Sequence, residues 1–515
     1  MEGRSLCAAA IVLSISLLVP TALGNGRFPR AQRVVESPGH PERLTVAGTY
    51  GLLVTDDRGK NWSHVCDAAF TFEPMFASDV LLEITADGSL VLGVQKSVTI
   101  SHDRGCDFAK VFEPPGASSI DDFTMSSTNL DEVLALVTTF EGGRNTVRLQ
   151  ESMDGGQTWK VTGSPLPAAL VYTLDVDPQN SSRLYVTGSA LSSDAQAPEL
   201  FLTSSDRGGS WAVGTIPGTS IDSSPWIAAI HPRDGNKIFV RTDSWKKDVS
   251  SQDIAGDALL YSDDGGKTWT ELLRAGGSEA SVPGAKMLGF ALSPDGSTAL
   301  VGYGDIVDPV RVVDPDAKWV GLYQSSSDGR YSFGPGAPAA PVRLMNVPVT
   351  CLSWTKEGIY GCFAPKGQGQ YVAFTADPSL TPASFTTLMK TSEVLGAPRC
   401  CKGRAVSTCA WDNDCKVLGA CDAGTPAVDA GGAMCEGAGG SGGTGADAGA
   451  TGGTGGGAAG AAGGVAGATD GSGSRSPDGC GCRLVGARTN EIDRRLFCFA
   501  GVLIAATRRC RTRRR

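Results

Sequence analysis

An eight-residue phrase, Ser/Thr-x-Asp-x-Gly-x-x-Trp, recurs through the first two thirds of this chain and limits its fold more than any other feature. Copies start at Thr55, Ser101, Ser152, Ser204 and Ser262, and a degenerate copy runs from Ser326 to Phe333. Successive starts lie about 46 to 64 residues apart, and one short motif per period of that length is typical of a modular array. The repeat therefore predicts an architecture before it indicates any function.

Between the copies, the sequence has the pattern of short strands. Around the fourth copy, the apolar and β-branched runs that predict four strands are Val171–Val176, Leu184–Thr187, Leu200–Thr203 and Trp211–Val213. Four antiparallel strands per repeat, arranged in a circle, make an all-β fold, the β-propeller. We count seven blades over residues 25–389, and six is the alternative because the last module has almost lost the phrase.

Each residue of the phrase has a structural role in a tight turn. The Asp carboxylate accepts backbone N–H groups, Gly takes a conformation closed to other residues, and the aromatic ring covers apolar space between sheets. We expect these roles for Asp57, Gly59, Trp62, Asp103, Gly105, Asp154, Gly156, Trp159, Asp206, Gly208, Trp211, Asp264, Gly266 and Trp269.

Calcium binding is the alternative role for the paired acids of the phrase, Asp56 with Asp57 and Asp263 with Asp264. It is disfavoured because the glycine spacing differs from that of an EF-hand loop and no bidentate Glu closes the loop. We therefore expect neither a metal nor another cofactor.

Residues 1–24 predict a secretory signal peptide. Arg4 precedes an apolar run from Cys7 to Pro20, and small residues follow at Ala22 and Gly24. An uncleaved anchor is the alternative, but the run is shorter than the ~20 residues of a spanning helix. We expect export.

Residues 390–436 predict a small disulfide segment, and its six cysteines are Cys400, Cys401, Cys409, Cys415, Cys421 and Cys435. In an exported chain such a set forms up to three bridges, whose connectivity the sequence does not give. Zinc is the alternative, although no pair of Cys-x-x-Cys units and no nearby histidine supports it. Residues 437–477 are almost wholly Gly, Ala, Ser and Thr, which predicts a disordered linker.

Residues 478–515 have the order of a sorting or anchoring tail. Cys480 and Cys482 precede the apolar run Leu496–Thr507, and six of the last eight residues are arginines. This order predicts membrane association through the tail. The tail from Arg483 onward carries a charge of +8 and the whole chain −9, so residues 25–482 carry −17. A body this acidic is unsuited to nucleic acid.

Four cysteines lie inside the predicted propeller. Cys351 and Cys362 fall on neighbouring strands of one blade, whereas Cys66 and Cys106 follow copies of the phrase in adjacent blades. Both pairs are candidate disulfides after export. Free buried thiols are the alternative for each pair.

The repeated phrase resembles the Asp-box, or BNR, repeat of sialidases and related propellers. The resemblance implies a propeller with each box between the third and fourth strands of a blade, but it does not imply hydrolysis. The tail resembles the C-terminal sorting signal of myxobacterial surface proteins, with Gly479–Cys482 in the place of its Gly-Cys motif. That resemblance implies processing near the cysteine and retention at the cell surface or outer membrane.

Loops on the face opposite the Asp boxes are the predicted search area for a ligand. The longest insertions between second and third strands, 242–257 and 305–318, belong to adjacent blades. Their candidate binding residues are Trp245, Lys246, Lys247, Asp308 and Arg311. An aromatic ring beside basic groups suits a sugar or an acidic glycan, and an ordinary solvated loop is the alternative.

We therefore expect a non-catalytic, surface-displayed monomer that binds a glycan, a matrix polymer or a protein partner. A secreted hydrolase of sialidase-like fold is the alternative, and it would need three clustered arginines and a Tyr–Glu pair. The Arg-Ile-Pro motif of that family is matched only in part by Arg27–Arg30. An envelope assembly factor is a third hypothesis, which differs from the first only in its partner.

Overall fold

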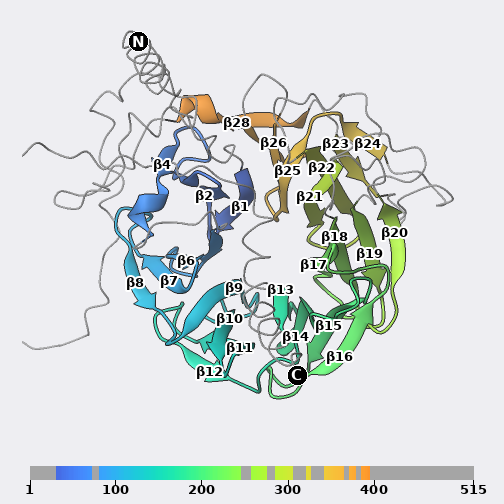
Figure 1. Ribbon diagram of the computed structural model, residues 1–515. Coiled ribbons are helices and arrows are strands. Elements are labelled where there is room, and N and C mark those ends of the chain that lie inside the picture. Colours follow the sequence, from blue (N-terminus) through green and yellow to red (C-terminus); the bar gives the residue numbers. More distant parts are fainter. Residues whose placement is uncertain are drawn as a thin grey trace, which may run out of the picture.

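The computed structural model describes residues 31–71, 80–244, 257–274, 285–305, 321–325, 342–364, 371–377 and 384–394. They form seven four-stranded antiparallel sheets arranged around a ring (Figure 1). The first strands of successive blades contact one another around the centre. The prediction of a β-propeller is confirmed, and seven is the correct number of blades.

Each blade uses four strands that are consecutive in the chain. Blades 1 to 4 consist of β1 (Ala31–Ser37), β2 (His40–Gly48), β3 (Gly51–Thr55), β4 (Ser63–Val65); β5 (Leu81–Ile84), β6 (Leu90–Val94), β7 (Ser97–Ser101), β8 (Ala109–Phe112); β9 (Ala117–Met125), β10 (Val133–Glu141), β11 (Arg144–Ser152), β12 (Lys160–Thr162); β13 (Leu170–Asp177), β14 (Asn180–Ser189), β15 (Glu199–Ser204) and β16 (Ala212–Ile216). Blades 5 to 7 consist of β17 (Ser223–Ile230), β18 (Ile238–Ser244), β19 (Ala258–Ser262), β20 (Thr270–Arg274); β21 (Ala285–Leu292), β22 (Ala299–Asp305), β23 (Gly321–Gln324), β24 (Val342–Met345); β25 (Val349–Trp354), β26 (Ile359–Phe363), β27 (Tyr371–Thr375) and β28 (Thr386–Lys390).

Five copies of the phrase lie in the turns between the third and fourth strands of blades 1 to 5; four are complete, and the copy from Ser101 has Phe108 in place of the Trp. In the first copy, Asp57 accepts the Thr55 hydroxyl at 2.8 Å and the backbone N–H of Asn61 at 2.9 Å. Gly59 has φ +84° and donates its N–H to the Thr55 hydroxyl, while its carbonyl accepts the Trp62 indole N–H at 3.0 Å. The turn thus satisfies its own polar groups and directs the indole into the core.

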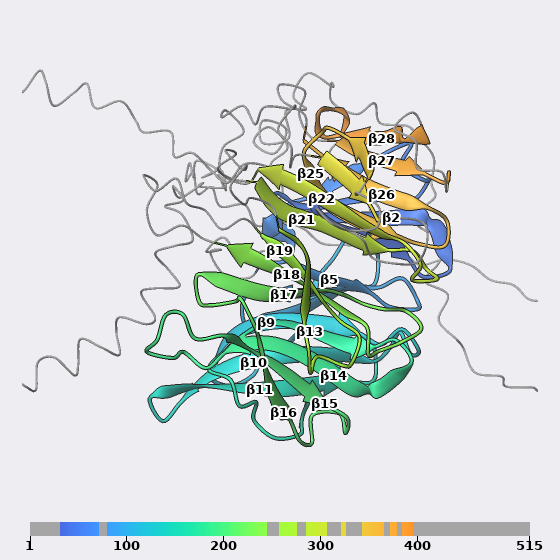
Figure 2. The same cartoon turned by 90° about the vertical axis from the view of Figure 1, so that its right-hand side faces the viewer.

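The sheets stand next to one another around the ring (Figure 2), and buried side chains of adjacent blades form the clusters between them. Between blades 4 and 5, for example, the Trp269 ring meets Phe201 edge-on at 5.0 Å. The box of blade 4 also reaches blade 3 through Arg207, whose guanidinium pairs with the buried carboxylates of Glu132 and Glu151. Adjacent blades are therefore joined by apolar burial and, at this box, by charge.

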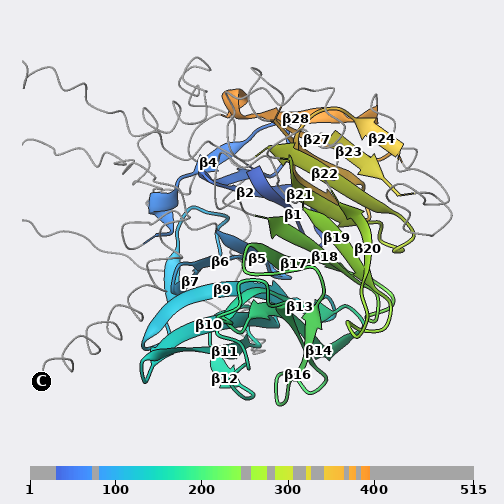
Figure 3. The same cartoon turned by 45° about the vertical axis from the view of Figure 1, so that its right-hand side comes forward.

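Blade 7 closes the ring against blade 1 without exchanging a strand, within the described sheets. One buried cluster spans the two blades, with Val34 and Trp62 from blade 1 and Val372 and Met389 from blade 7. Glu36 adds polar contacts by accepting the hydroxyls of Thr355 and Tyr360, both at 3.1 Å. The two ends of the chain's propeller lie side by side (Figure 3).

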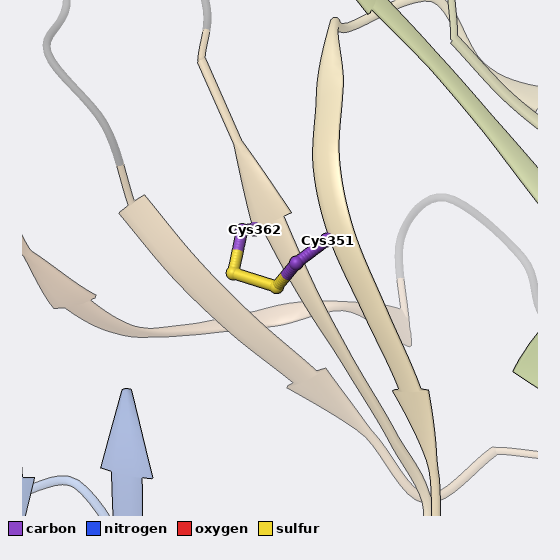
Figure 4. The surroundings of a disulfide bond; sticks show 2 residues. All are labelled: Cys351 and Cys362. Carbon is purple, nitrogen blue, oxygen red and sulfur yellow. A yellow bond between two sulfur atoms is a disulfide. The ribbon is translucent and has the colours of Figure 1, made fainter. Parts of the chain in front are cut away.

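A disulfide joins Cys351 of β25 to Cys362 of β26, as predicted (Figure 4). Cys66 and Cys106 are also disulfide-bonded. The pairing of Cys66 with Cys106 stays a prediction. In that same part, no helix has the length and apolar character needed to cross a membrane.

Candidate functional site

The two faces of the ring carry different kinds of residues. One face carries the Asp boxes and the turns between first and second strands. The other, which we call the entry face, carries the starts of the first strands and the connections between second and third strands. The loops predicted as a search area connect second and third strands and so belong to the entry face.

An aromatic pair with a cation lies on the entry side of blades 4 and 5. Tyr172 of β13 and Trp226 of β17 have ring centroids 5.9 Å apart. The register of β17 and β18 sets Arg241 opposite Trp226, and the Arg241 guanidinium carbon lies 5.6 Å from the centre of the indole. Trp226 and Arg241 remain partly exposed, whereas Tyr172 is buried. We call these three residues the Trp226 cluster.

The guanidinium of Arg241 has no carboxylate partner among the described residues. Its described contact is the cation–π contact with Trp226, worth about 0.5–1 kcal/mol at a partly exposed site. The five guanidinium N–H groups therefore remain available for a ligand hydroxyl or carboxylate.

A buried acid lies behind the Trp226 cluster. The hydroxyl of Tyr172 donates to Glu199 Oε2 at 3.4 Å, and Glu199 is 3 % exposed. Burial raises the pKa of the Glu199 carboxyl, against the effect of hydrogen bonds from Ser189 and Tyr172. Tyr172 and Glu199 form a Tyr–Glu pair, and the described contact of Arg241 is with Trp226 rather than with this pair.

A buried ion triad holds the entry side of blades 5 and 6. The ammonium of Lys286 lies 3.0 Å from Asp243 and 3.6 Å from Asp257, and it also donates to the Ser244 carbonyl. Asp257, only 1 % exposed, accepts the backbone N–H groups of Ser244 and Met287, both at 2.8 Å. Burial raises the pKa of Asp257, and the charge of Lys286 opposes that rise.

The ion triad fixes the strand ends from which the predicted search area begins. Ser244 and Asp257 border residues 245–256, and Ala285, next to Lys286, pairs with Asp305 at the border of residues 306–320. The candidate residues themselves, Trp245, Lys246, Lys247, Asp308 and Arg311, lie outside the described residues, as do Cys480 and Cys482. The bases of the two loops are neighbours on the entry face.

Four charged residues from the first strands of blades 1 to 4 interact around the centre of the ring. Arg33 pairs with Glu83 at 2.9 Å, and it also attracts Asp122 and Asp175. Burial raises the pKa of Asp122 to about 7, although two backbone N–H groups donate to it. Burial and the neighbouring Asp122 raise the pKa of Asp175 well above its ordinary value. The sequence did not predict this acidic centre, whose four residues lie in the first strands β1, β5, β9 and β13.

The Asp-box carboxylates are occupied by their own turns. Asp264 accepts the Thr268 hydroxyl and backbone N–H as well as the Ser262 hydroxyl, and these bonds hold its pKa below its usual range. Ser210 acts likewise on Asp206 and lowers its pKa to about 2. Over the described residues, no group of three or more His, Cys, Asp or Glu side chains has a metal-binding arrangement.

Comparisons with known proteins identify the repeat but do not indicate a function. The family model described as "BNR/Asp-box repeat" matches residues 260–271, the box of blade 5. No curated protein matches the chain.

Solved structures of similar fold include hydrolases of two kinds. An ancestral GH74 enzyme is 14% identical over 71% of this chain and 47% of its own, with a TM-score of 0.47. The GH74 xyloglucanase of Xanthomonas campestris is 15% identical over 68% of this chain and 52% of its own, also with 0.47. A puromycin-hydrolyzing peptidase of Mycobacterium tuberculosis is 14% identical over 71% and 53%, with 0.46. This chain spans about half the length of each, and at such scores none indicates what it acts on.

Proposed function

We propose that this protein is a non-catalytic, exported binding module that holds a polysaccharide chain against the entry face of blades 4 and 5. The Trp226 cluster is the observation that supports the proposal. A partly exposed indole supplies an apolar surface for a sugar ring, and an arginine without a carboxylate partner supplies donors for hydroxyl or carboxylate groups. The predicted linker and surface-sorting tail suit a module displayed on a cell.

A hydrolase is the second candidate, and the Tyr172–Glu199 pair is the observation in its favour. Against it stands the burial of the pair, since Glu199 is only 3 % exposed and lies behind Tyr172. Tyr172 is also 5 % exposed and covered by Trp226, so a substrate has little access to its hydroxyl.

The test measures binding and cleavage in the same tubes. The full exported chain is incubated with an acidic and a neutral polysaccharide, and retained protein and released reducing ends are both measured. We expect retention without release, reduced several-fold by Arg241→Gln and by Trp226→Ala. Arg183→Gln is the matched control, because Arg183 lies over the Tyr185 ring at 5.2 Å on the Asp-box face.

Release of reducing ends would overturn the non-catalytic reading and direct attention to Glu199. Absence of retention on either polymer, with folded protein, would exclude a polysaccharide of the tested kinds and favour a protein partner.

A further inference from the structure

The charge partners of the arginines set Arg241 apart from comparable residues. The chain as a whole is acidic, with a formal net charge of −9, so carboxylates are plentiful. Arg241 is partly exposed, and its described contact is the ring of Trp226 rather than a carboxylate. Partly exposed arginines elsewhere in the described residues form ion pairs with carboxylates, and they include Arg43, Arg104, Arg148, Arg183, Arg207 and Arg274. The charge of Arg241 is therefore available to a group outside the fold.

The carboxylate that shares a strand with Arg241 is held by another cation. Asp243 lies two residues further along β18, so its side chain is on the same face of the sheet as that of Arg241. The Asp243 carboxylate, however, lies 3.0 Å from the ammonium of Lys286, which belongs to β21 of the next blade. Asp257 and the Ser244 carbonyl hold Lys286 in that place. Lys286 thus keeps Asp243 from pairing with Arg241.

The indole of Trp226 positions the Arg241 guanidinium without using its hydrogen-bond donors. The guanidinium carbon lies 5.6 Å from the centre of the indole. Trp226 is itself held, because its N–H donates to the Ser224 hydroxyl at 3.3 Å and its ring packs on Tyr172. A cation–π contact uses the charge of a guanidinium and none of its five N–H groups. Arg241 therefore offers a positioned set of charged donors on the entry side of blades 4 and 5.

A planar set of charged donors matches a carboxylate better than a hydroxyl. Two parallel N–H groups of a guanidinium can bind both oxygens of a carboxylate, and such charge-assisted bonds are about twice as strong as neutral ones. A hydroxyl has one oxygen and brings no charge. The negative net charge of the chain does not favour a polyanion, so a preference for one has to come from a local site.

We propose that the polysaccharide held at the entry face carries carboxylates, and that Arg241 selects it by pairing with the carboxylate of a sugar acid. Lys286 is a positioning residue in this arrangement, because it holds Asp243 and so leaves Arg241 available. This selectivity rests on the proposed function, since it names the class of polysaccharide that the Trp226 cluster takes.

Retention on two forms of one polymer tests the proposal. Polygalacturonate carries carboxylates, and its methyl ester has the same backbone without their charges. We expect the full exported chain to bind polygalacturonate about tenfold more tightly than the ester, the effect of about one charge-assisted contact. Arg241→Gln should abolish this preference. Arg241→Lys keeps the charge and loses the planar fork, so it should leave an intermediate preference.

Arg183→Gln is the matched control, because it removes the same charge from the Asp-box face. It should leave the preference for polygalacturonate unchanged. The arginine-rich tail from Arg483 onward is present in every variant, so it cannot cause a difference among them. An equal preference in the wild-type chain, Arg241→Gln and Arg183→Gln would overturn the proposal.

A rescue experiment tests the role of Lys286. Lys286→Met leaves Asp243 free to pair with Arg241, so it should lower the preference several-fold. Adding Asp243→Asn removes that competitor and should restore the preference, although the double variant still lacks the cation beside Asp257. Asp243→Asn alone should raise retention on polygalacturonate, and this variant keeps Lys286 in case its loss prevents folding. A double variant without recovery, or weaker retention by Asp243→Asn, would overturn the positioning role.

The outcomes separate this selectivity from the proposed function. Equal retention on both forms of the polymer would leave polysaccharide binding in place and overturn the selection of carboxylates. Tighter retention on dextran sulfate than on polygalacturonate would overturn the assignment to a carboxylate in favour of a sulfate ester. No retention of folded protein on any of these polymers would overturn both.

Discussion

The propeller contains two arginine–aromatic contacts of the same kind on opposite faces. On the Asp-box face, Arg183 lies over Tyr185 at 5.2 Å, donates to Asn236 at 2.9 Å and lies 3.7 Å from Asp177. On the entry face, Arg241 lies over Trp226 at 5.6 Å, and its described contacts end there. The guanidinium of Arg183 thus has three partners within the fold, whereas that of Arg241 is held by one ring contact and keeps its N–H groups available.

The same contrast holds between the two faces more widely. The Asp-box carboxylates and hydroxyls bond within their own turns, so these groups stabilise turns and leave little for a ligand. The entry face combines the ion triad of Lys286, Asp243 and Asp257 with the Arg241 guanidinium, which has no carboxylate partner among the described residues. Residues that repeat from blade to blade build the scaffold, and a binding function therefore depends on residues that occur once.

Lys286→Met should have the largest effect on stability, because it leaves Asp257 buried without its cation. Removing one partner of a buried pair is strongly destabilising, so we expect a loss of about 3 kcal/mol in the free energy of unfolding. Urea unfolding measures it. Lys160→Met on the other face is the matched control, because Lys160 is 67% exposed beside Glu151 and should cost less than about 0.5 kcal/mol. Equal losses for the two variants would contradict the contrast between the faces.

Gly266→Ala tests how tightly an Asp box is packed. Gly266 has φ +87°, and a Cβ there would lie 2.1 Å from the ring of Phe201, which itself packs on Trp269. Backbone strain and overpacking together should cost about 2 to 3 kcal/mol. Gly142→Ala is the control, because Gly142 has φ +58° and open space around it, so only the strain should remain. Calorimetry compares the two, and a similar cost for both would show that the box tolerates a side chain.

The fold could be predicted from the sequence because its signal is local. Five Asp boxes mark the turns between third and fourth strands, and the runs between them mark the other strands. Even blade 7, where the phrase is almost lost, was found from its strand pattern alone. The Cys351–Cys362 disulfide could be predicted because the two residues fall on neighbouring strands of one blade, whereas the pairing of Cys66 with Cys106 stays a prediction.

The candidate site could not be predicted because it has no local signal. Tyr172 and Trp226 lie in different blades, and Arg241 joins them only through the register of β17 and β18. A tryptophan outside the phrase, such as Trp226, was the available clue. The acidic centre likewise depends on four first strands meeting around the ring, which no spacing in the sequence reveals.

The contributions of the central carboxylates and of the Asp-box carboxylates to stability should change with pH in opposite directions. The pKa of Asp122 is raised to about 7, so its contribution is present at low pH and is lost as the pH rises from about 4 to 7. Asp122→Asn should flatten that decline by about 1 kcal/mol, after allowance for its partial exposure. The pKa of Asp206 is lowered to about 2, so its contribution is present above about pH 4 and is lost as the pH falls from about 4 to 2, and Asp206→Asn should flatten that decline in acid. Thermal unfolding between pH 2 and 8 measures both, and the same sign for the two variants would refute the assignment.

Substitutions of the two arginines should have the smallest effects on stability. They also test most directly whether Arg241 serves the fold or a ligand. Arg183→Gln removes an ion pair, a hydrogen bond and a cation–π contact, and should cost about 1 kcal/mol of stability without changing polysaccharide retention. Arg241→Gln removes one partly exposed contact, so it should cost less than about 0.5 kcal/mol while reducing retention several-fold. Melting temperature and retention, measured on the same preparations, separate the two effects. If Arg241→Gln destabilised the protein as much as Arg183→Gln and left retention unchanged, Arg241 would be another residue of the scaffold, and the ligand would have to be sought elsewhere on the entry face.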